Sequence, residues 1–217
     1  MAAVRTEIDP ADLGARPFYR LLTAVVVPRP IAWVSSRSAA GVDNLAPHSF
    51  FTVSCVSPPI IQFTSVGIKD TLRNVQETRE FVVNLAPEPL FEQINATATD
   101  YPRGISEFDA VGLEREPSRR VTPPRVAGSP VALECRLHST LALGDSTVVL
   151  GEVVHAAVAE GAVVDGHPEI GRLRPLARLG KDQWSAVGEV RAIPRIRYAD
   201  VAAADRDGDG AAGRGSA

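Results

Sequence analysis

Residues 131–159 read VALECRLHSTLALGDSTVVLGEVVHAAVA, and their pattern decides the fold class. Successive side chains of a strand point to opposite faces, so alternation of apolar and polar residues indicates a strand with one buried face. The apolar set is Val131, Leu133, Cys135 and Leu137, and the set predicted to face solvent is Ala132, Glu134, Arg136 and His138. The LGDST segment at 143–147 predicts a turn, so 131–143 and 147–159 should form an antiparallel hairpin.

Other short β-branched runs, bounded by Gly, Pro, Ser or Asp, predict further strands at 24–27, 31–36, 58–65 and 81–85. Many short strands favour a closed or partly closed antiparallel barrel, because closure removes exposed edges. The regular alternation of strands with long helices that a doubly wound sheet needs is missing. The chain also lacks the G-x-G-x-x-G and G-x-x-x-x-G-K-[ST] patterns of common nucleotide-binding folds.

Helical signals are few. Residues 70–80 predict a helix with Asp70 as its N-cap, and its expected apolar face is Leu72, Val75 and Gln76. Residues 89–99 predict a second helix, grouping Leu90, Phe91 and Ile94. The stretch 101–130 predicts a long surface excursion with a short helix near 106–112, and the tail from Asp200 has the composition of a disordered segment.

The composition is that of one soluble globular domain rather than two small ones, with 217 residues of which 45% are hydrophobic and 23% charged. A net charge of -3 provides no basic field for nucleic acid. The amino terminus carries charges where a signal peptide needs an apolar stretch, and no apolar run is long enough to span a bilayer. We therefore expect a cytoplasmic protein with no nucleic-acid or membrane partner.

The cysteines and histidines give no indication of a metal centre. Cys55 and Cys135 are far apart and should be buried, inert thiols. The four histidines are scattered without the spacing of a zinc site; they are His48, His138, His155 and His167. We expect no metal.

The segment NLAPHSFF at 44–51 combines polar groups with two phenylalanines. Pro47 cannot donate to a ladder, so an uninterrupted central strand is not expected here. Free backbone groups, with Asn44 and Ser49, could bind the edge of a planar heterocycle that Phe50 or Phe51 contacts. The alternative is a β-bulge with two core phenylalanines, which the local pattern alone favours, just as a lone His48 is more often structural than catalytic.

The segment TSVGIKDT at 64–71 predicts an anion site. Lys69 is one of only two lysines, the other being Lys181, and it directly precedes a predicted helix start, where free amides and the helix dipole favour an anion. Thr71 and Ser65 add hydroxyl groups. Together they describe a phosphate site; a solvated lysine beside an ordinary Asp70 cap is the equally weighted alternative.

A series of motifs then follows in the order found in a known family. These motifs are RPIAWVSS, GVDNLAPHSFF, SPPIIQFTS, KDTLRNV, EFVVNL, SEFDAVGLE, PRVAGSPVALECRL and LGEVV. From about Arg16 to about Arg197 the chain resembles the flavin reductase-like family, the FMN-binding split barrels, in the branch that includes flavoredoxin-like proteins. No single motif is decisive; their number and order carry the resemblance.

The resemblance implies a mainly β protein with a few helices, built as a six-stranded split β-barrel of Greek-key type. It also implies a homodimer with FMN at or near the subunit interface, and it divides the chain into an extension (1–15), the FMN-binding domain (16–198) and a disordered tail (199–217). The residues it assigns to the isoalloxazine are Asn44, Ala46, Pro47, His48, Ser49 and Phe50. Those it assigns to the ribityl phosphate are Ser65, Lys69, Asp70 and Thr71.

Two positions depart from the pattern of the relatives. His48 stands where many of them have Phe or Tyr, and RLGKDQW at 178–184, with Lys181 and Trp184, replaces a Gly-Gly followed by Tyr.

The activity implied is NAD(P)H:flavin oxidoreductase, in which the flavin accepts hydride from the nicotinamide. Backbone donors from 46–50 would stabilise charge on the reduced ring, and no side chain is assigned as a catalytic acid or base. Two functions of different class fit these motifs. One is a flavin reductase, either alone or as the reductase component of a flavin-dependent monooxygenase. The other is a flavoredoxin-like carrier that retains FMN and exchanges electrons with a protein partner. The choice between NADH and NADPH stays open.

Overall fold

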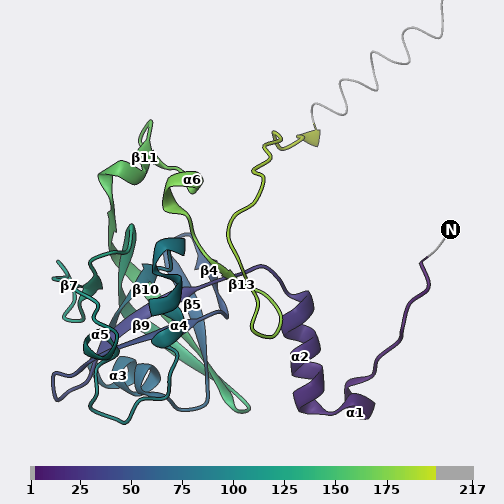
Figure 1. Cartoon of the computed structure of the whole chain (residues 1–217), viewed down its shortest axis with the longest axis horizontal. Helices are drawn as coiled ribbons and strands as arrows, with labels where there is room; N and C mark the ends of the chain where they lie inside the picture. Colours follow the sequence, from purple (N-terminus) through teal and green to yellow (C-terminus); the bar gives the residue numbers. More distant parts are fainter. Residues whose placement is uncertain (1–2, 199–217) are drawn as a thin grey trace, which may run out of the picture. The chain divides into compact units, whose positions relative to one another are not determined.

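A computed structural model describes residues 3–198, and its main feature is a seven-stranded antiparallel sheet (Figure 1). The order of the strands in the sheet is β3-β2-β6-β9-β10-β5-β4. Their bounds are β2 (Ala32–Arg37), β3 (Asp43–His48), β4 (Phe51–Cys55), β5 (Ile60–Val66), β6 (Glu80–Leu85), β9 (Val131–Leu143) and β10 (Ser146–Val158).

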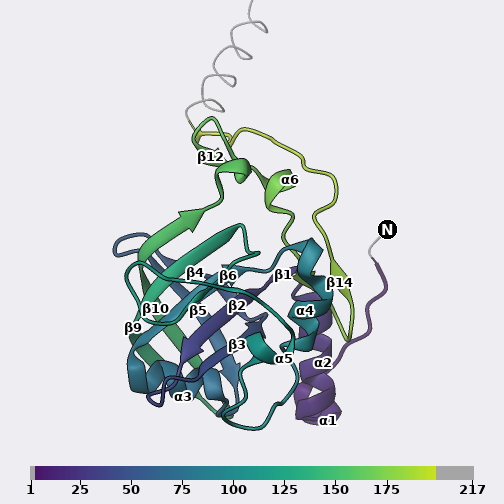
Figure 2. The same cartoon turned by 60° about the vertical axis from the view of Figure 1, so that its left-hand side comes forward.

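The sheet curls into a split barrel (Figure 2). β3 and β4 follow one another along the chain yet lie at opposite ends of the strand order, so the chain crosses between the two ends at Ser49 and Phe50. At this crossing the amide of Thr64 in β5 donates to the carbonyl of Phe50 at 2.9 Å. The predicted split barrel is confirmed, with seven strands instead of six because the segment 43–55 contributes a strand to each end.

The remaining elements are short, apart from two helices. The helices are α1 (Pro10–Leu13), α2 (Ala15–Val25), α3 (Asp70–Thr78), η1 (Glu88–Leu90), α4 (Phe91–Ala96), α5 (Glu107–Ala110), η2 (Glu160–Ala162) and α6 (Ile170–Leu173). The two-residue strands are β1 (Arg29–Pro30), β7 (Arg115–Glu116), β8 (Arg125–Val126), β11 (Val163–Val164), β12 (His167–Pro168), β13 (Ala177–Arg178) and β14 (Trp184–Ser185). No described helix is both long and apolar enough to cross a membrane.

The predicted hairpin is present. β9 and β10 pair from Leu143 opposite Ser146, leaving a two-residue turn in which Gly144 has φ +59°, a left-handed conformation that glycine adopts without strain. Gly151 in β10 marks a register shift, and a Cβ there would lie 2.2 Å from the Phe81 ring. A glycine is therefore required where this ring crosses the hairpin.

The helix predictions need correction. Residues 24–27 are not a strand: α2 runs to Val25, and its β-branched end continues the helical spacing of Phe18, Leu21 and Leu22. α3 has Lys69 as its N-cap, and Asp70, the predicted cap, lies in the first turn. Gln76 is exposed, and the helix buries Asn74 instead.

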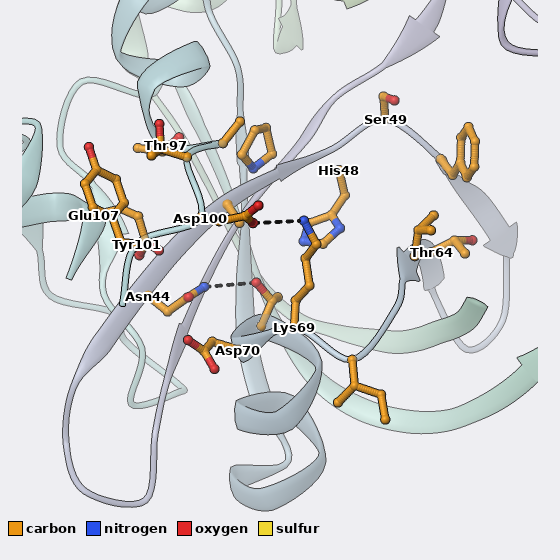
Figure 3. Close-up of a pocket in the computed structure, with 18 of the residues that line it drawn as sticks. Asn44, His48, Ser49, Thr64, Lys69, Asp70, Thr97, Asp100, Tyr101 and Glu107 are labelled. Atoms are coloured by element: carbon orange, nitrogen blue, oxygen red, sulfur yellow. Dashed lines mark hydrogen bonds and ion pairs between the residues drawn. The ribbon is translucent and has the colours of Figure 1, made fainter. Parts of the chain in front are cut away.

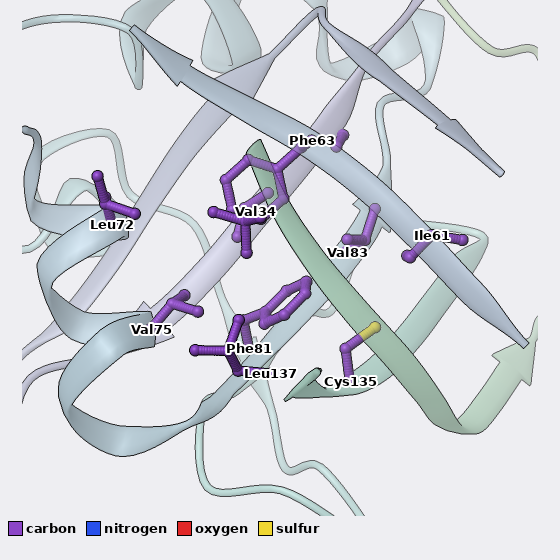
Figure 4. Packing of buried hydrophobic residues seen from close by; sticks show 11 residues of the cluster. Val34, Ile61, Phe63, Leu72, Val75, Phe81, Val83, Cys135 and Leu137 are labelled. Atoms are coloured by element: carbon purple, nitrogen blue, oxygen red, sulfur yellow. The ribbon is translucent and has the colours of Figure 1, made fainter. Parts of the chain in front are cut away.

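Two apolar layers cover opposite faces of β2. Val34 points into the barrel, where Phe63, Phe81 and Leu137 form its core with residues of α3 (Figure 4). Trp33 points to the other side and packs with residues of α4 and α5. Both Trp33 and Val34 are fully buried, so β2 is covered on both faces.

The outer face of β9 is not wet along its whole length. Ala132 and Glu134, both predicted to face solvent, are buried, because the 101–130 excursion covers them. The Glu134 carboxylate accepts hydrogen bonds from the amides of Arg119 and Arg120 at 2.9 and 2.6 Å and from Arg125 Nε at 2.9 Å. The excursion is therefore anchored to the hairpin, and its predicted short helix is α5.

Cys135 is buried as expected, and burial raises the pKa of its thiol. Cys55 is only partly buried, so the prediction of a buried thiol is wrong there; it lies in β4 at the end of the sheet.

The compact barrel unit ends at Val187, and the described residues beyond it, 188–198, are exposed. The predicted disordered tail lies outside the described residues.

Candidate functional site

A cavity of about 510 Å³ opens between β3, the start of α3 and the loop after α4 (Figure 3). Its volume is in the range of small-molecule sites. Nine of the residues assigned from the sequence line it, namely Asn44, Ala46, Pro47, His48, Ser49, Phe50, Lys69, Asp70 and Thr71. The fold thus brings the 44–50 and 69–71 segments to one cavity.

Ser65 is the assigned residue that does not line this cavity. Its side chain is fully buried, and its hydroxyl donates to the carbonyl of Gly67 at 2.9 Å. Here Ser65 shapes the turn that leads to Lys69.

β3 forms one wall and continues through Pro47, which pairs with Trp33; as expected it is not a central strand, although the chain does not break at the proline. The strand tolerates proline because it lies at the end of the sheet, where only one side of the backbone is paired. The amide of Leu45 points away from β2 and donates to Glu107 Oε2 at 2.8 Å. By strand alternation Pro47 faces the same way, and it has no N–H to offer there.

The two phenylalanines have different places. Phe50 lines the cavity, whereas Phe51 packs against the barrel core. Buried Arg29 lies 6.0 Å from the Phe50 ring centroid, and its Nε donates to Ser49 Oγ at 3.5 Å. The same guanidinium donates to the carbonyls of Thr23, Val26 and Leu179, at 3.0 Å for Val26 and 2.8 Å for Leu179. Arg29 therefore fixes this wall to the end of α2.

The opposite wall is the start of α3. No side chain caps this helix, so its first amides are free of side-chain acceptors. Lys69 Nζ lies 3.4 Å from Asp100 Oδ1, and both groups are largely exposed. Asp70 pairs with Arg73 at 2.8 Å, and Asn44 Nδ2 donates to Thr71 Oγ1 at 2.9 Å. Two cations and uncapped amides thus meet at one side of the cavity, which suits an anion.

His48 lies between these walls with its ring 4.7 Å from that of Phe63. Its side chain is buried, and Nε2 has no hydrogen-bond partner among the described residues. Burial lowers the pKa of His48 to about 4; a hydrogen bond with the Thr64 backbone opposes the shift and the Lys69 charge adds to it. The imidazole is therefore neutral near pH 7.

The third wall of the cavity is not predicted from the sequence. Thr97 to Tyr101, from the loop after α4, and Glu107 of α5 line the cavity, together with Tyr19 of α2. Burial raises the pKa of Glu107, while its hydrogen bond from the Leu45 amide opposes the shift. An irregular and mostly exposed segment carries no periodic signal by which its place beside the cavity could be predicted.

Lys181 and Trp184 do not line this cavity. Trp184 packs edge-on against Phe91, with ring centroids 5.2 Å apart, and lies under the Arg178 guanidinium at 4.6 Å. Lys181 is exposed. The departure from the relatives at 178–184 therefore affects packing beside α4.

The fold and cavity define a split barrel with a candidate ligand site at its seam. The sequence pattern of the flavin reductase like domain matches residues 24–170, more than half of the chain. The chain belongs to the flavin reductase-like family, as its motifs predict.

The chain is similar to other proteins over most of its length. An uncharacterized protein of Deinococcus radiodurans is 37% identical over 207 residues, which cover 89% of this chain and 91% of that protein. The structure of nitrilotriacetate monooxygenase component B from Bacillus cereus is 31% identical, with a TM-score of 0.85 over 88% of this chain and 100% of that one. The 2-nitrobenzoate 2-nitroreductase NbaA of Pseudomonas fluorescens is 30% identical, with a TM-score of 0.81 over 89% of this chain and 98% of that one.

The burial of His48 predicts a pH-dependent stability. Its pKa is about 4 in the folded chain and about 6.5 when unfolded, so the unfolded state binds the proton more readily and the folded state loses stability as pH falls below 6.5. This group alone should lower the free energy of unfolding by about 3 kcal/mol between pH 6.5 and pH 4. Urea unfolding of the wild type and of His48→Phe at pH 6.5 and pH 4 measures this change in the free energy of unfolding. The change should be smaller in the variant. Parallel pH profiles for the two proteins would contradict it.

Proposed function

We propose that this chain binds FMN in the cavity beside β3 and α3 and reduces it with NADH or NADPH. The observation that carries the proposal is the meeting of the 44–50 strand with an uncapped helix start and Lys69 in one cavity of about 510 Å³. A flat wall of mixed polarity and an anion site side by side match a ring joined to a phosphate. The family supports the same assignment.

The phosphate of FMN would be held by Lys69, by the Thr71 hydroxyl and by the first amides of α3. Thr71 Oγ1 already accepts from Asn44 and still has its own proton to donate. Arg73 is engaged by Asp70, so Lys69 is the cation with the weaker partner, an exposed pair with Asp100 that solvent screens. A phosphate would readily displace this carboxylate.

Bound FMN supplies a ring that accepts hydride from a nicotinamide and passes electrons to an acceptor. The chain's own residues bind and orient it. β3 and Phe50 provide a wall anchored by Arg29, and the neutral His48 supports this wall with its buried ring against Phe63. No side chain need act as acid or base at this site, and the barrel face excludes water from one side.

Removing the Lys69 ammonium should weaken FMN far more than riboflavin, which has no phosphate. We expect Lys69→Ala to reduce FMN affinity by about 1 to 3 kcal/mol and to leave riboflavin nearly unchanged, because one charged hydrogen bond is lost. Flavin fluorescence titrations measure both ligands.

Lys181→Ala is the matched control, since it removes the only other lysine, which lies outside the cavity. Equal losses for FMN and riboflavin in Lys69→Ala, or an equal effect of Lys181→Ala, would reject the phosphate assignment.

The reductase activity has its own test. With FMN added in excess, the protein should oxidise NADH or NADPH catalytically, and comparison of the two donors identifies the preferred one. Names of similar proteins include both a monooxygenase component and a nitroreductase, so oxygen and a nitroaromatic should be compared as final acceptors. FMN that stays bound and inert to both nicotinamides would reject the reductase and favour an electron carrier with a protein partner.

We also propose that the protein is a homodimer in the cytoplasm. α2 exposes Tyr19, Leu22 and Val25, and Val53 of β4 is 70% exposed, which is much apolar surface for a monomer of 23.1 kDa. Light scattering should give twice the monomer mass. A monomer, both with and without FMN, would contradict the dimer.

A further inference from the structure

A second cavity, of about 410 Å³, adjoins the first. The two share Asn44 and Asp70 as lining residues, and Figure 3 shows both side chains at the edge of the first cavity beside the start of α3. The second cavity lies between the β2–β3 turn, one face of α3 and the 103–105 loop. The two cavities are therefore neighbours at the start of α3, separated by the side chains of Asn44 and Asp70.

The side chains of α3 that line this cavity follow helical spacing, since Asp70, Asn74 and Glu77 are four and three residues apart. Asn74 is fixed by its hydrogen bond to Ser36 Oγ at 3.1 Å, and Asp70 by Arg73. In the described part of the chain, neither the side chain of Glu77 nor that of Arg103 has a hydrogen bond or ion pair. One carboxylate and one guanidinium are thus available in the same cavity.

These charges do not make a cation site. Asp43 is paired with Arg37 at 2.6 Å and with Arg115 at 2.9 Å, and Asp70 is paired as well, which leaves Glu77 as the single uncommitted carboxylate. No cluster of metal-ligating side chains occurs among residues 3–198.

We propose that the second cavity binds the adenosine diphosphate half of a dinucleotide. The inference rests on the proposed function, because it places the flavin phosphate at the start of α3, between the two cavities. Arg103 binds a phosphate oxygen, the Glu77 carboxylate accepts from the ribose hydroxyls, and Val42 and Ile105 contact the base. The group belongs either to FAD, entering with its flavin, or to the nicotinamide donor, entering separately.

The two sources are separated by two titrations of the purified protein. The first compares the dissociation constants of FMN and FAD. The second measures ADP-ribose binding to the FMN-saturated protein by calorimetry. We expect either FAD to bind about fivefold or more tightly than FMN, or ADP-ribose to bind beside FMN. The first result assigns the site to FAD and the second to the nicotinamide donor.

Both titrations are repeated with Glu77→Gln and Arg103→Ala. Each variant should reduce by about fivefold either the factor by which FAD binds more tightly than FMN or the affinity for ADP-ribose. The affinity for FMN should stay unchanged. Glu92→Gln and Arg136→Ala are matched controls, because both residues are exposed and line neither cavity. The controls should leave all constants unchanged.

The inference is overturned if FAD binds no more tightly than FMN and ADP-ribose does not bind. It is also overturned if neither variant changes the tighter binding of FAD or the binding of ADP-ribose. Failure of FMN to bind the wild type would instead reject the proposed function. In that case, titration of ADP-ribose into the flavin-free protein tests whether the second cavity binds the adenosine diphosphate group by itself.

Discussion

The crossing of the chain at Ser49 and Phe50 is the constraint on which the rest of the structure depends. One continuous segment supplies the strands at both ends of the sheet, so the sheet has to curl until those ends meet. The hydrogen bond from the Thr64 amide to the Phe50 carbonyl fixes the seam. The cavity lies at this seam because β3 is paired on one side only, and the start of α3 follows directly after β5. The segment 43–55 therefore both closes the barrel and forms part of the site.

The pattern of neighbouring residues predicts the structural features that those residues themselves determine. The alternation in 131–143 and the Gly144 turn predicted the hairpin correctly, because period and turn chemistry lie within a few neighbouring residues. The same alternation misplaces Glu134, since the irregular excursion that directly precedes β9 folds back and covers that part of the strand. The prediction of a strand at 24–27 fails for a different reason. The β-branched residues favour a strand locally, but Phe18, Leu21, Leu22 and Val25 have the i, i+3, i+4, i+7 spacing of one helix face, and α2 continues to Val25.

For the site, the sequence identified both halves of the cavity but not its third wall. The 44–50 and 69–71 segments stand out because proline, lysine and polar residues interrupt apolar runs. The two segments meet in one cavity because the barrel closes. The order of the motifs indicates this meeting only through the resemblance to the family. Asp100 comes from the loop after α4 and Glu107 from the excursion, whose path is fixed by anchors such as Glu134. Such placement cannot be read from neighbouring residues, nor can the burial that keeps His48 neutral.

The edge position of Pro47 has a consequence beyond the site. An end strand with free backbone donors is a template on which another chain can add a strand and start aggregation. Along β3 two successive outward positions offer no such donor, because the Leu45 amide is taken by Glu107 and Pro47 has none. A split barrel keeps its sheet ends accessible to a ligand, and this pattern leaves the end accessible while blocking the growth of intermolecular sheet. Pro47 therefore removes one of the donors on which an added strand would be built.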